Sequence, residues 1–346
     1  MNPGPDTAET MPPPAGVARD VAPDLSHPER LGRYRLVHRI GMGGMGVVFV
    51  GHDELLDREV AIKLLFRREG PSDAQTRLLR EAQALARLAH PNVIAVHEIA
   101  EFEDYVFIIM ELVVGATLRT WLGERPRTQA ELLAVLSQAG AGLAAMHVAG
   151  LVHRDIKPDN IMVGNDGRVR VLDFGLARAA DDPPEAPAPD ASLSSSSLLG
   201  VEVTRTGALL GTPGYMAPEQ YFHEAPTARS DIFAFCVVLF EAFHGKRPFA
   251  GATPLAIRDA IMSGQLREVA GTTAPRWIDA IVRRGLSTAP EDRWPSMEAL
   301  LAALADDPLA RRRRLVRGAA LLVLVSALVT LFVLSYVTLA RLRAQE

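Results

Sequence analysis

The stretch from His153 to Asn160 combines a carboxylate, an ammonium group and an amide within a few residues. The carboxylate of Asp155 can accept a proton from an attacking hydroxyl, and the ammonium of Lys157 can neutralise charge on a moving phosphoryl group. The amide of Asn160 can hold a metal ion, and a second carboxylate farther along, Asp173, is suited to Mg²⁺. One such stretch can arise by chance, so the rest of the chain must supply a nucleotide site.

Composition and charge are those of an ordinary globular protein, with 48% hydrophobic and 23% charged residues over 346 positions. The formal net charge of −4 gives no reason to expect nucleic-acid binding. The single cysteine, Cys236, excludes an internal disulfide and a cysteine-based zinc site, and its apolar neighbours predict a small buried side chain. Residues 1–30 are rich in Pro, Ala and Asp and lack the apolar core of a signal peptide, so we expect them to be disordered.

Apolar periodicity predicts a small sheet with one helix, followed by a mainly helical region. The predicted elements of the first part are strands over 34–40, 47–50 and 58–65, a helix over 73–88, and strands over 93–99 and 105–112. In the second part, helical patterns start at residue 118, are clearest over 131–148 and return over 217–305. Short strands over 161–163 and 169–172 are expected on either side of the turn after the catalytic stretch.

A glycine-rich turn joins the first two predicted strands, with glycines at 41, 43 and 46. Glycines let the backbone fold tightly over a polyphosphate and direct N–H groups toward it. A dinucleotide fingerprint is excluded, because here a strand and not a helix follows the turn. Lys63 on the third strand would neutralise phosphates, and Glu81 on the next helix is its best partner. The alternatives are a solvated strand lysine and an exposed helical glutamate.

Taken together, these motifs resemble those of bacterial eukaryotic-like (Hanks-type) serine/threonine protein kinases. The resemblance covers residues 34–305 and includes Gly211–Glu219, which resembles the segment that docks peptide substrates. Six motifs occur in the family's order, which makes a chance match negligible. The resemblance implies a bilobal α+β kinase fold, with a β-rich N-lobe over 34–112 and a larger helical C-lobe over 113–305.

The resemblance also implies roles for individual residues. Asp155 would be the catalytic base, Lys157 would contact the γ-phosphate, and Asn160 and Asp173 would bind Mg²⁺, with Mn²⁺ as an alternative metal. Lys157 also indicates serine and threonine rather than tyrosine as acceptors. The ATP site would be formed by the glycine turn, the strands beside it, a gatekeeper at 110 and a hinge at 111–113: Ile40, Gly41, Met42, Gly43, Gly44, Met45, Gly46, Val48, Ala61, Lys63, Glu81, Met110, Glu111 and Val113.

Further residues would brace or regulate the site. By resemblance, Glu219 would pair with Arg293, Asp231 would anchor the catalytic loop from a buried helix, and Thr212 would contact Asp155 and Lys157. Arg154 is typical of kinases that are switched on by phosphorylation of the activation loop.

Within the activation loop, Thr204 and Thr206 are the expected autophosphorylation sites, ahead of Ser194–Ser197. The loop carries a Pro-, Ala- and Ser-rich insertion over 179–199 that is longer than the family needs, and we expect it to be mobile. Val114 stands just after the hinge, where many relatives carry an acidic residue.

The last part of the chain differs from the rest. A basic segment over 311–317 precedes an uncharged run of 23 residues over 318–340. As a helix this run would be about 34 Å long, enough to cross a bilayer. A buried core helix is the alternative, but cores rarely need a helix that is apolar all round. The basic excess predicts a single-pass anchor in the cell membrane, a cytoplasmic kinase domain and a short tail, 341–346, outside.

The sequence therefore predicts a membrane-anchored enzyme that transfers the γ-phosphate of ATP to serine or threonine hydroxyls of protein substrates. A membrane-anchored pseudokinase scaffold is the alternative, which the intact Lys63, Asp155, Asn160 and Asp173 disfavour. A small-molecule phosphotransferase of kinase-like fold is disfavoured by Gly211–Glu219. Lipid contact is expected through 318–340, and a homodimer through this span stays open, although it lacks a Gly-x-x-x-Gly pattern.

Overall fold

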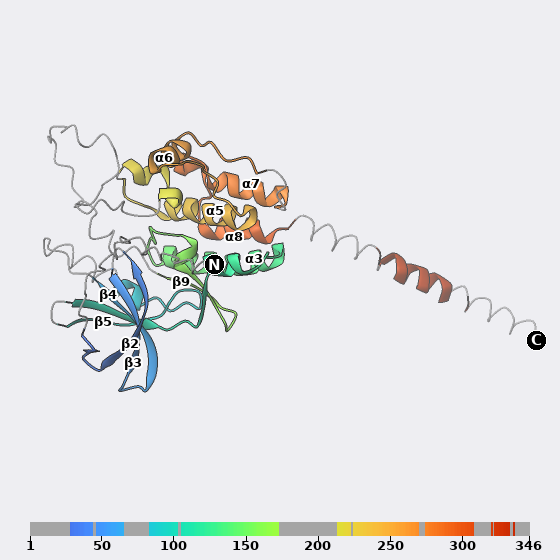
Figure 1. Cartoon of the computed structure of the whole chain (residues 1–346). Helices are drawn as coiled ribbons and strands as arrows, with labels where there is room; N and C mark the ends of the chain where they lie inside the picture. Colours follow the sequence, from blue (N-terminus) through green and yellow to red (C-terminus); the bar gives the residue numbers. More distant parts are fainter. Residues whose placement is uncertain are drawn as a thin grey trace, which may run out of the picture.

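The computed structural model describes residues 28–43, 46–65, 83–102, 105–172, 213–222, 224–269, 274–307, 320, 322–332 and 335. Figure 1 shows a strand-rich lobe, drawn mostly in blue, beside a helical lobe drawn from green to orange. The predicted bilobal α+β architecture is thus confirmed for the kinase part of the chain.

The N-lobe is one six-stranded antiparallel sheet with the order β1-β2-β3-β4-β6-β5. Its strands are β1 Arg30–Leu31, β2 Tyr34–Gly43, β3 Gly46–Asp53, β4 Arg58–Leu65, β5 Val96–Phe102 and β6 Tyr105–Glu111. Valine and isoleucine suit this pleated, half-buried surface. One face packs as the small-lobe core, made of Leu31, Tyr34, Val47, Phe49, Val60, Ile62, Leu64, Phe107 and Ile109.

The sheet differs from the sequence-based expectation at two places. The two-residue strand β1 was not expected, because so short a segment carries no periodicity. The strand predicted over 93–99 begins only at Val96, since Val93 forms a parallel bridge with Val171. Ile94 also donates its N–H to the Val171 carbonyl at 3.0 Å, so this part of the N-lobe chain is fastened to the C-lobe.

The C-lobe begins with a three-stranded sheet of β7 Gly115–Thr117, β8 Ile161–Gly164 and β9 Val169–Val171. Its helices are α2 Leu118–Glu124, α3 Gln129–Val148, α5 Ala228–His244, α6 Pro254–Met262, α7 Arg276–Gly285 and α8 Met297–Ala305. Short 3₁₀ turns are η1 Pro158–Asn160, η3 Pro213–Tyr215, η4 Pro218–Phe222 and η5 Pro290–Asp292. The predicted helices and short strands of this lobe are present.

Helix α5 is the centre of the C-lobe. Every residue from Ser230 to Phe240 is buried, including Cys236, as expected from its apolar neighbours. Thr227 caps the helix start through its side chain, and Gly245 ends the helix with φ 69°, a left-handed conformation that favours glycine. Because α5 is buried along this length, its polar residues must find partners inside the protein.

Two apolar helices bear on the predicted membrane span. Helix α3 is long and apolar enough to cross a bilayer, but half of its most apolar window is buried and it packs in the C-lobe core. The run over 318–340 is described only in part, as an apolar helix over Leu322–Phe332 with exposed side chains. Figure 1 draws this helix in dark red, apart from both lobes.

Several sequence-based predictions lie outside the described residues. These are the disorder of 1–27, the insertion 179–199, the basic segment 311–317 and the tail 341–346. The predicted disorder extended to residue 30, and there it is wrong, because Arg30 lies in β1 and Glu29 accepts the N–H of Leu36 at 2.9 Å. Of the helix predicted over 73–88, residues 83–88 are described; 83–86 are helical, whereas the helix has already ended at 87 and 88.

Candidate active site

The backbone of the catalytic stretch is hydrogen-bonded to the side chain of Asp231 on α5. Its carboxylate is buried and accepts the N–H groups of His153 at 2.7 Å and Arg154 at 2.8 Å. The Nε2 atom of His147, on α3, lies 2.9 Å from the same carboxylate. These bonds satisfy the buried charge of Asp231 and attach the catalytic stretch to α5.

His153 connects the catalytic stretch to the end of β9. Its Nε2 lies 2.7 Å from the carbonyl oxygen of Leu172, which can only accept, so Nε2 carries the proton. The Nδ1 atom is then free to accept the N–H of Asp155 at 3.3 Å. The neutral ring therefore joins the candidate base to the residue just before Asp173, although Asp173 itself lies outside the described residues.

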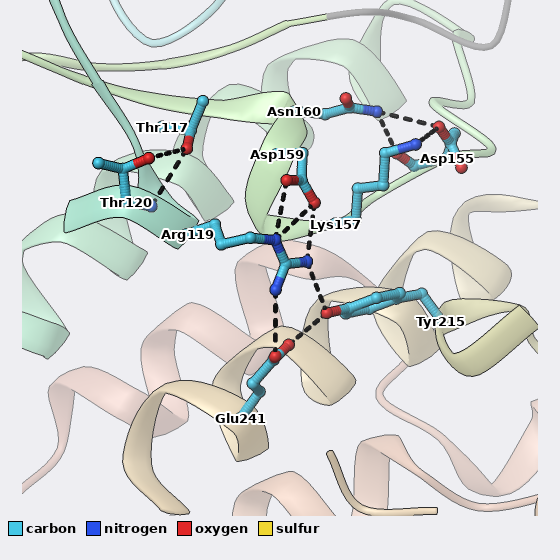
Figure 2. A network of polar contacts seen from close by, with 9 residues as sticks. All are labelled: Thr117, Arg119, Thr120, Asp155, Lys157, Asp159, Asn160, Tyr215 and Glu241. Carbon is cyan, nitrogen blue, oxygen red and sulfur yellow. Dashed lines mark hydrogen bonds and ion pairs between the residues drawn. The ribbon is translucent and has the colours of Figure 1, made fainter. Parts of the chain in front are cut away.

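The three reactive side chains of the stretch converge, as Figure 2 shows. Lys157 Nζ donates to Asp155 Oδ2 at 2.7 Å, and Asn160 Nδ2 donates to the same oxygen at 3.0 Å. Asn160 Nδ2 also donates to the main-chain carbonyl of Asp155 at 2.7 Å. The turn η1, which Pro158 begins, places Asn160 back over Asp155.

The environment of Asn160 fits a divalent cation. Both protons of its amide nitrogen are used by Asp155, and within the described part of the chain its Oδ1 accepts no hydrogen bond. Asn160 is buried as a residue, and an amide oxygen that has no donor is a suitable ligand for Mg²⁺, which prefers oxygen atoms. The donor set therefore agrees with the metal role inferred for Asn160 from the sequence.

On the nucleotide side, the strand register aligns residues that the sequence assigned to ATP. Val48 on β3 pairs with Lys63 on β4, and Ala61 on β4 pairs with Met110 on β6. Lys63 and Ala61 are buried. Val48, Ala61 and Met110 thus lie next to one another on three neighbouring strands, β3, β4 and β6.

The glycine turn is formed by the ends of β2 and β3. Ile40, Gly41, Met42 and Gly43 belong to β2, where Ile40 and Met42 are exposed. Gly46 opens β3 with φ 156°, and a Cβ there would clash with the carbonyl oxygen of Leu64, so glycine is required. The predicted site residues that lie outside the described part are Gly44, Met45, Glu81, Asp173, Thr204, Thr206 and Thr212.

The segment after β6 is the predicted hinge. Glu111 donates its N–H to the Ala95 carbonyl at 2.9 Å, which attaches the end of β6 to the chain before β5. The Glu111 carboxylate forms an ion pair with Arg170 Nη2 at 2.7 Å. Val113, two residues farther along, is half-buried.

Arg170 was missed by sequence reasoning. It is 3% exposed, and its two Nη atoms donate to Asp166 at 3.1 and 2.8 Å. These bonds raise the pKa of Arg170, with Asp166 as the main cause. The turn at 165–167 followed by two alternating arginines was the available signal, but it did not reveal that Arg170 also reaches the hinge.

A polar network connects η1 to η3 and α5, as Figure 2 shows. Arg119 on α2 donates to Asp159 through Nε at 2.8 Å and Nη2 at 2.7 Å, and Nη2 also reaches Tyr215 at 3.2 Å. Arg119 Nη1 lies 3.5 Å from Glu241, to which the Tyr215 hydroxyl donates. The hydrogen bonds that Arg119 donates to Asp159 raise the pKa of Arg119 and lower the pKa of Asp159. Sequence reasoning missed this network as well.

Glu219 and Arg293 are brought together, as the sequence suggested. Arg293 Nη1 and Nη2 donate to the two carboxylate oxygens of Glu219, each at 2.8 Å. The remaining three donors of Arg293 reach the carbonyls of Ser287, Arg229 and Thr288 at 2.8, 3.0 and 2.9 Å. All five N–H groups of a cation that is 1% exposed are therefore satisfied.

Comparison with known proteins agrees with this geometry. The model of the protein kinase domain family matches residues 34–303. Among similar proteins, a probable serine/threonine-protein kinase PknB of Lactococcus lactis is 32% identical over 81% of this chain and 43% of its own length. The serine/threonine-protein kinase PrkC of Bacillus subtilis is 33% identical, over 78% and 40%. PknL of Mycobacterium tuberculosis is 35% identical, over 80% and 66%.

The chain thus spans less than half the length of the first two relatives. The family match, by contrast, covers both lobes and all the contacts described above. From this match and this geometry, the chain belongs to the protein kinase domain family.

Proposed function

We propose that this protein transfers the γ-phosphate of ATP to serine or threonine hydroxyls of other proteins. The observation that carries the proposal is the Asp155 carboxylate, which Lys157 and Asn160 hold in a fixed place within a kinase fold. Phosphoryl transfer asks for positioning and for neutralised charge, and these three side chains supply a base, a cation and a metal ligand.

In the proposed step, the substrate hydroxyl oxygen forms a bond to the γ-phosphorus while the bond to the β–γ bridging oxygen breaks. ADP leaves with the electron pair of that bond, and the hydroxyl proton passes to Asp155. Lys157, donating to Asp155 at 2.7 Å, stands where it can also contact the moving phosphoryl group. The hydrogen bonds from Lys157 and Asn160 orient the carboxylate before the substrate arrives.

Mg²⁺, when bound with ATP, would neutralise the charge of the β- and γ-phosphates. Asn160 Oδ1 would be one ligand, and we propose Asp173 as the other from its place in the sequence. For the adenine ring, the Glu111 carbonyl and the Val113 N–H are the proposed hydrogen-bonding groups. The aligned Val48, Ala61 and Met110 would pack against it, and Lys63 would pair with the phosphates.

We also propose that autophosphorylation of Thr204 or Thr206 activates the kinase, with Arg154 as the receiving cation. The support is chemical, because a phosphothreonine adds negative charge that an arginine beside the base can bind.

The apolar segment 318–340 is proposed as a single-pass anchor that leaves the kinase domain in the cytoplasm. The exposed apolar helix Leu322–Phe332 and the arginines of 311–317 support this.

The activity test incubates the full chain in detergent with γ-labelled ATP, Mg²⁺ and a general protein substrate. We expect label on serine and threonine, and Asp155→Asn should lower the rate by about 10²-fold or more. Asp259→Asn, an equal loss of charge on an exposed surface of α6, is the matched control and should act like the parent. Absence of labelling by the parent, or equal labelling by Asp155→Asn, would overturn the proposal.

Mass spectrometry of the labelled protein tests the regulatory proposal by locating the phosphates. Phosphate at Thr204 or Thr206, with slower substrate labelling after Thr204→Ala plus Thr206→Ala, is the expected result.

The membrane anchor is tested by comparing the full chain with a version that ends at residue 310. The full chain should sediment with membranes and the shorter one should not; a shorter version that still sediments contradicts the assignment.

A further inference from the structure

Arg247 lies in the loop after α5 and packs against the turn η3. Its guanidinium stands over the ring of Tyr215, with 5.9 Å between its Cζ atom and the ring centroid. It also occupies the space beside Gly214, since a Cβ at that glycine would clash with Arg247 Nη1. The absence of a side chain at residue 214 thus lets a cation lie against the backbone of η3.

The turn η3 borders the reacting centre. Tyr215 shares Arg119 with Asp159, and Asp159 stands in η1 next to Asn160. The following turn, η4, also touches the catalytic stretch, because Gln220 Nε2 donates to the Arg154 carbonyl at 3.4 Å. A protein chain that brings a hydroxyl to Asp155 must therefore pass close to η3 and to the cation beside it.

The two arginines at Tyr215 differ in their charge environment. Arg119, at the hydroxyl, is paired with Asp159 at 2.7 Å and lies 3.5 Å from Glu241. Arg247, over the ring face, is half-buried and has no ion pair or hydrogen bond to any carboxylate in the part of the chain that the structure describes. The first cation is neutralised within the fold, whereas the second keeps its guanidinium donors for an external partner.

A half-buried guanidinium without an anion has lost part of its hydration and gains from a charged acceptor. Its planar pair of N–H groups matches the two oxygens of a carboxylate, which is the geometry of a bidentate ion pair. The cation–π contact with Tyr215 and the packing against Gly214 restrict the guanidinium and lower the entropy lost when it binds.

We propose that Arg247 is a specificity-determining residue that binds an acidic side chain of the protein substrate, beside the acceptor hydroxyl. The inference rests on the proposed kinase function and narrows its substrates to acidic peptides. Aspartate or glutamate near the acceptor would pair with Arg247, while a lysine at the same position would be repelled.

The test uses the full-length kinase in detergent and a set of peptides with one acceptor threonine. Each flanking position carries Glu, Gln or Lys in turn, and kcat/KM is measured for every peptide. For the parent we expect one or two positions at which Glu exceeds Gln by about tenfold. The Glu-to-Gln ratio is internal to each enzyme, so it does not depend on how active a variant is.

Arg247→Gln should bring this ratio close to one, and Arg247→Glu should reverse it in favour of Lys. Gly214→Ala offers an independent check, because the added methyl group displaces the guanidinium while the charge stays. We expect the ratio to fall in that variant too. Lys246→Gln is the matched control, since it removes the neighbouring exposed cation and should keep the parent ratio.

A parent enzyme that phosphorylates the peptides with no preference for Glu overturns the assignment while leaving the kinase function standing. An equal loss of the ratio in Lys246→Gln overturns it as well, because the preference would then reflect the general charge of the loop. If the parent phosphorylates no peptide and no protein, the proposed function fails, and the substrate assignment fails with it.

Discussion

The carboxylate of Asp231 accepts the backbone N–H of Arg154 at 2.8 Å, and Arg154 has φ 68°. This left-handed conformation costs a residue other than glycine about 1–2 kcal/mol. The second carboxylate oxygen accepts the N–H of His153 at 2.7 Å, so two charge-assisted hydrogen bonds hold the strained backbone just before Asp155. The position of the base thus depends on a helix that lies far away in the sequence.

Asp231→Asn should weaken this support while preserving the shape of the side chain. An amide offers one acceptor oxygen in place of two, so a backbone N–H or His147 loses its partner, at a cost of about 1–3 kcal/mol. We expect a folded protein with a lower melting temperature and a kcat reduced at least tenfold, with KM for ATP little changed. Thermal unfolding and initial-rate kinetics check this; a variant with the parent's kcat would show that the base does not depend on Asp231.

Glu219 and Arg293 should show strong coupling in a double-mutant cycle. Arg293→Met leaves a buried carboxylate without its partner and should destabilise the protein by about 3–5 kcal/mol. Glu219→Gln combined with Arg293→Met should cost less than the sum of the two single changes, because no unpaired charge remains. Urea unfolding of the parent, both single variants and the double variant measures the coupling; additive losses would contradict a direct pair.

The carboxylate of Glu219 should also make the free energy of unfolding depend on pH. Burial by itself raises the pKa of Glu219, but its hydrogen bonds from Arg293 and Ser230 outweigh burial and leave the pKa below the ordinary value of 4.5. A carboxyl whose pKa is lower in the folded state stabilises the fold fully above the unfolded-state pKa. That stability is lost as the pH falls below about 4.5.

The free energy of unfolding should therefore decline less steeply with acid in Glu219→Gln than in the parent. Urea unfolding at a series of pH values between neutral and acid measures the two slopes. Glu268→Gln, which changes an exposed glutamate, serves as the control and should follow the parent. Equal slopes in the parent and Glu219→Gln would show that this carboxyl does not titrate differently on folding.

Arg170 should matter for ATP binding, although it stands outside the predicted nucleotide site. It links β9 to the hinge through Glu111 at 2.7 Å. Arg170→Met releases the hinge glutamate and leaves Asp166 with fewer donors, so we expect KM for ATP to rise several-fold while kcat changes less. Arg168→Met is the matched control, because that arginine is half exposed and lies 3.8 Å from Glu111. Equal effects of the two changes would argue against a special role for Arg170.

Much of the fold could be predicted from the sequence because its signals are local. Strand-favouring segments on either side of a glycine-rich turn indicated β2 and β3, and a sustained helical pattern indicated α3. The order of the motifs indicated the kinase family, and Asp155, Lys157 and Asn160 are close in sequence, so one turn is enough to bring them together.

Side chains that meet only through packing could not be predicted in this way. Tyr215 and Arg119 are 96 positions apart, and Arg247 reaches η3 only because α5 ends at Gly245 and turns the chain back. Periodicity reports which face of an element is apolar, but it carries no information on which distant element covers that face. The sequence by itself determined the family and the catalytic stretch. The tertiary structure decided the charge balance around Tyr215, because ion pairing depends on distances that only the packed lobes set.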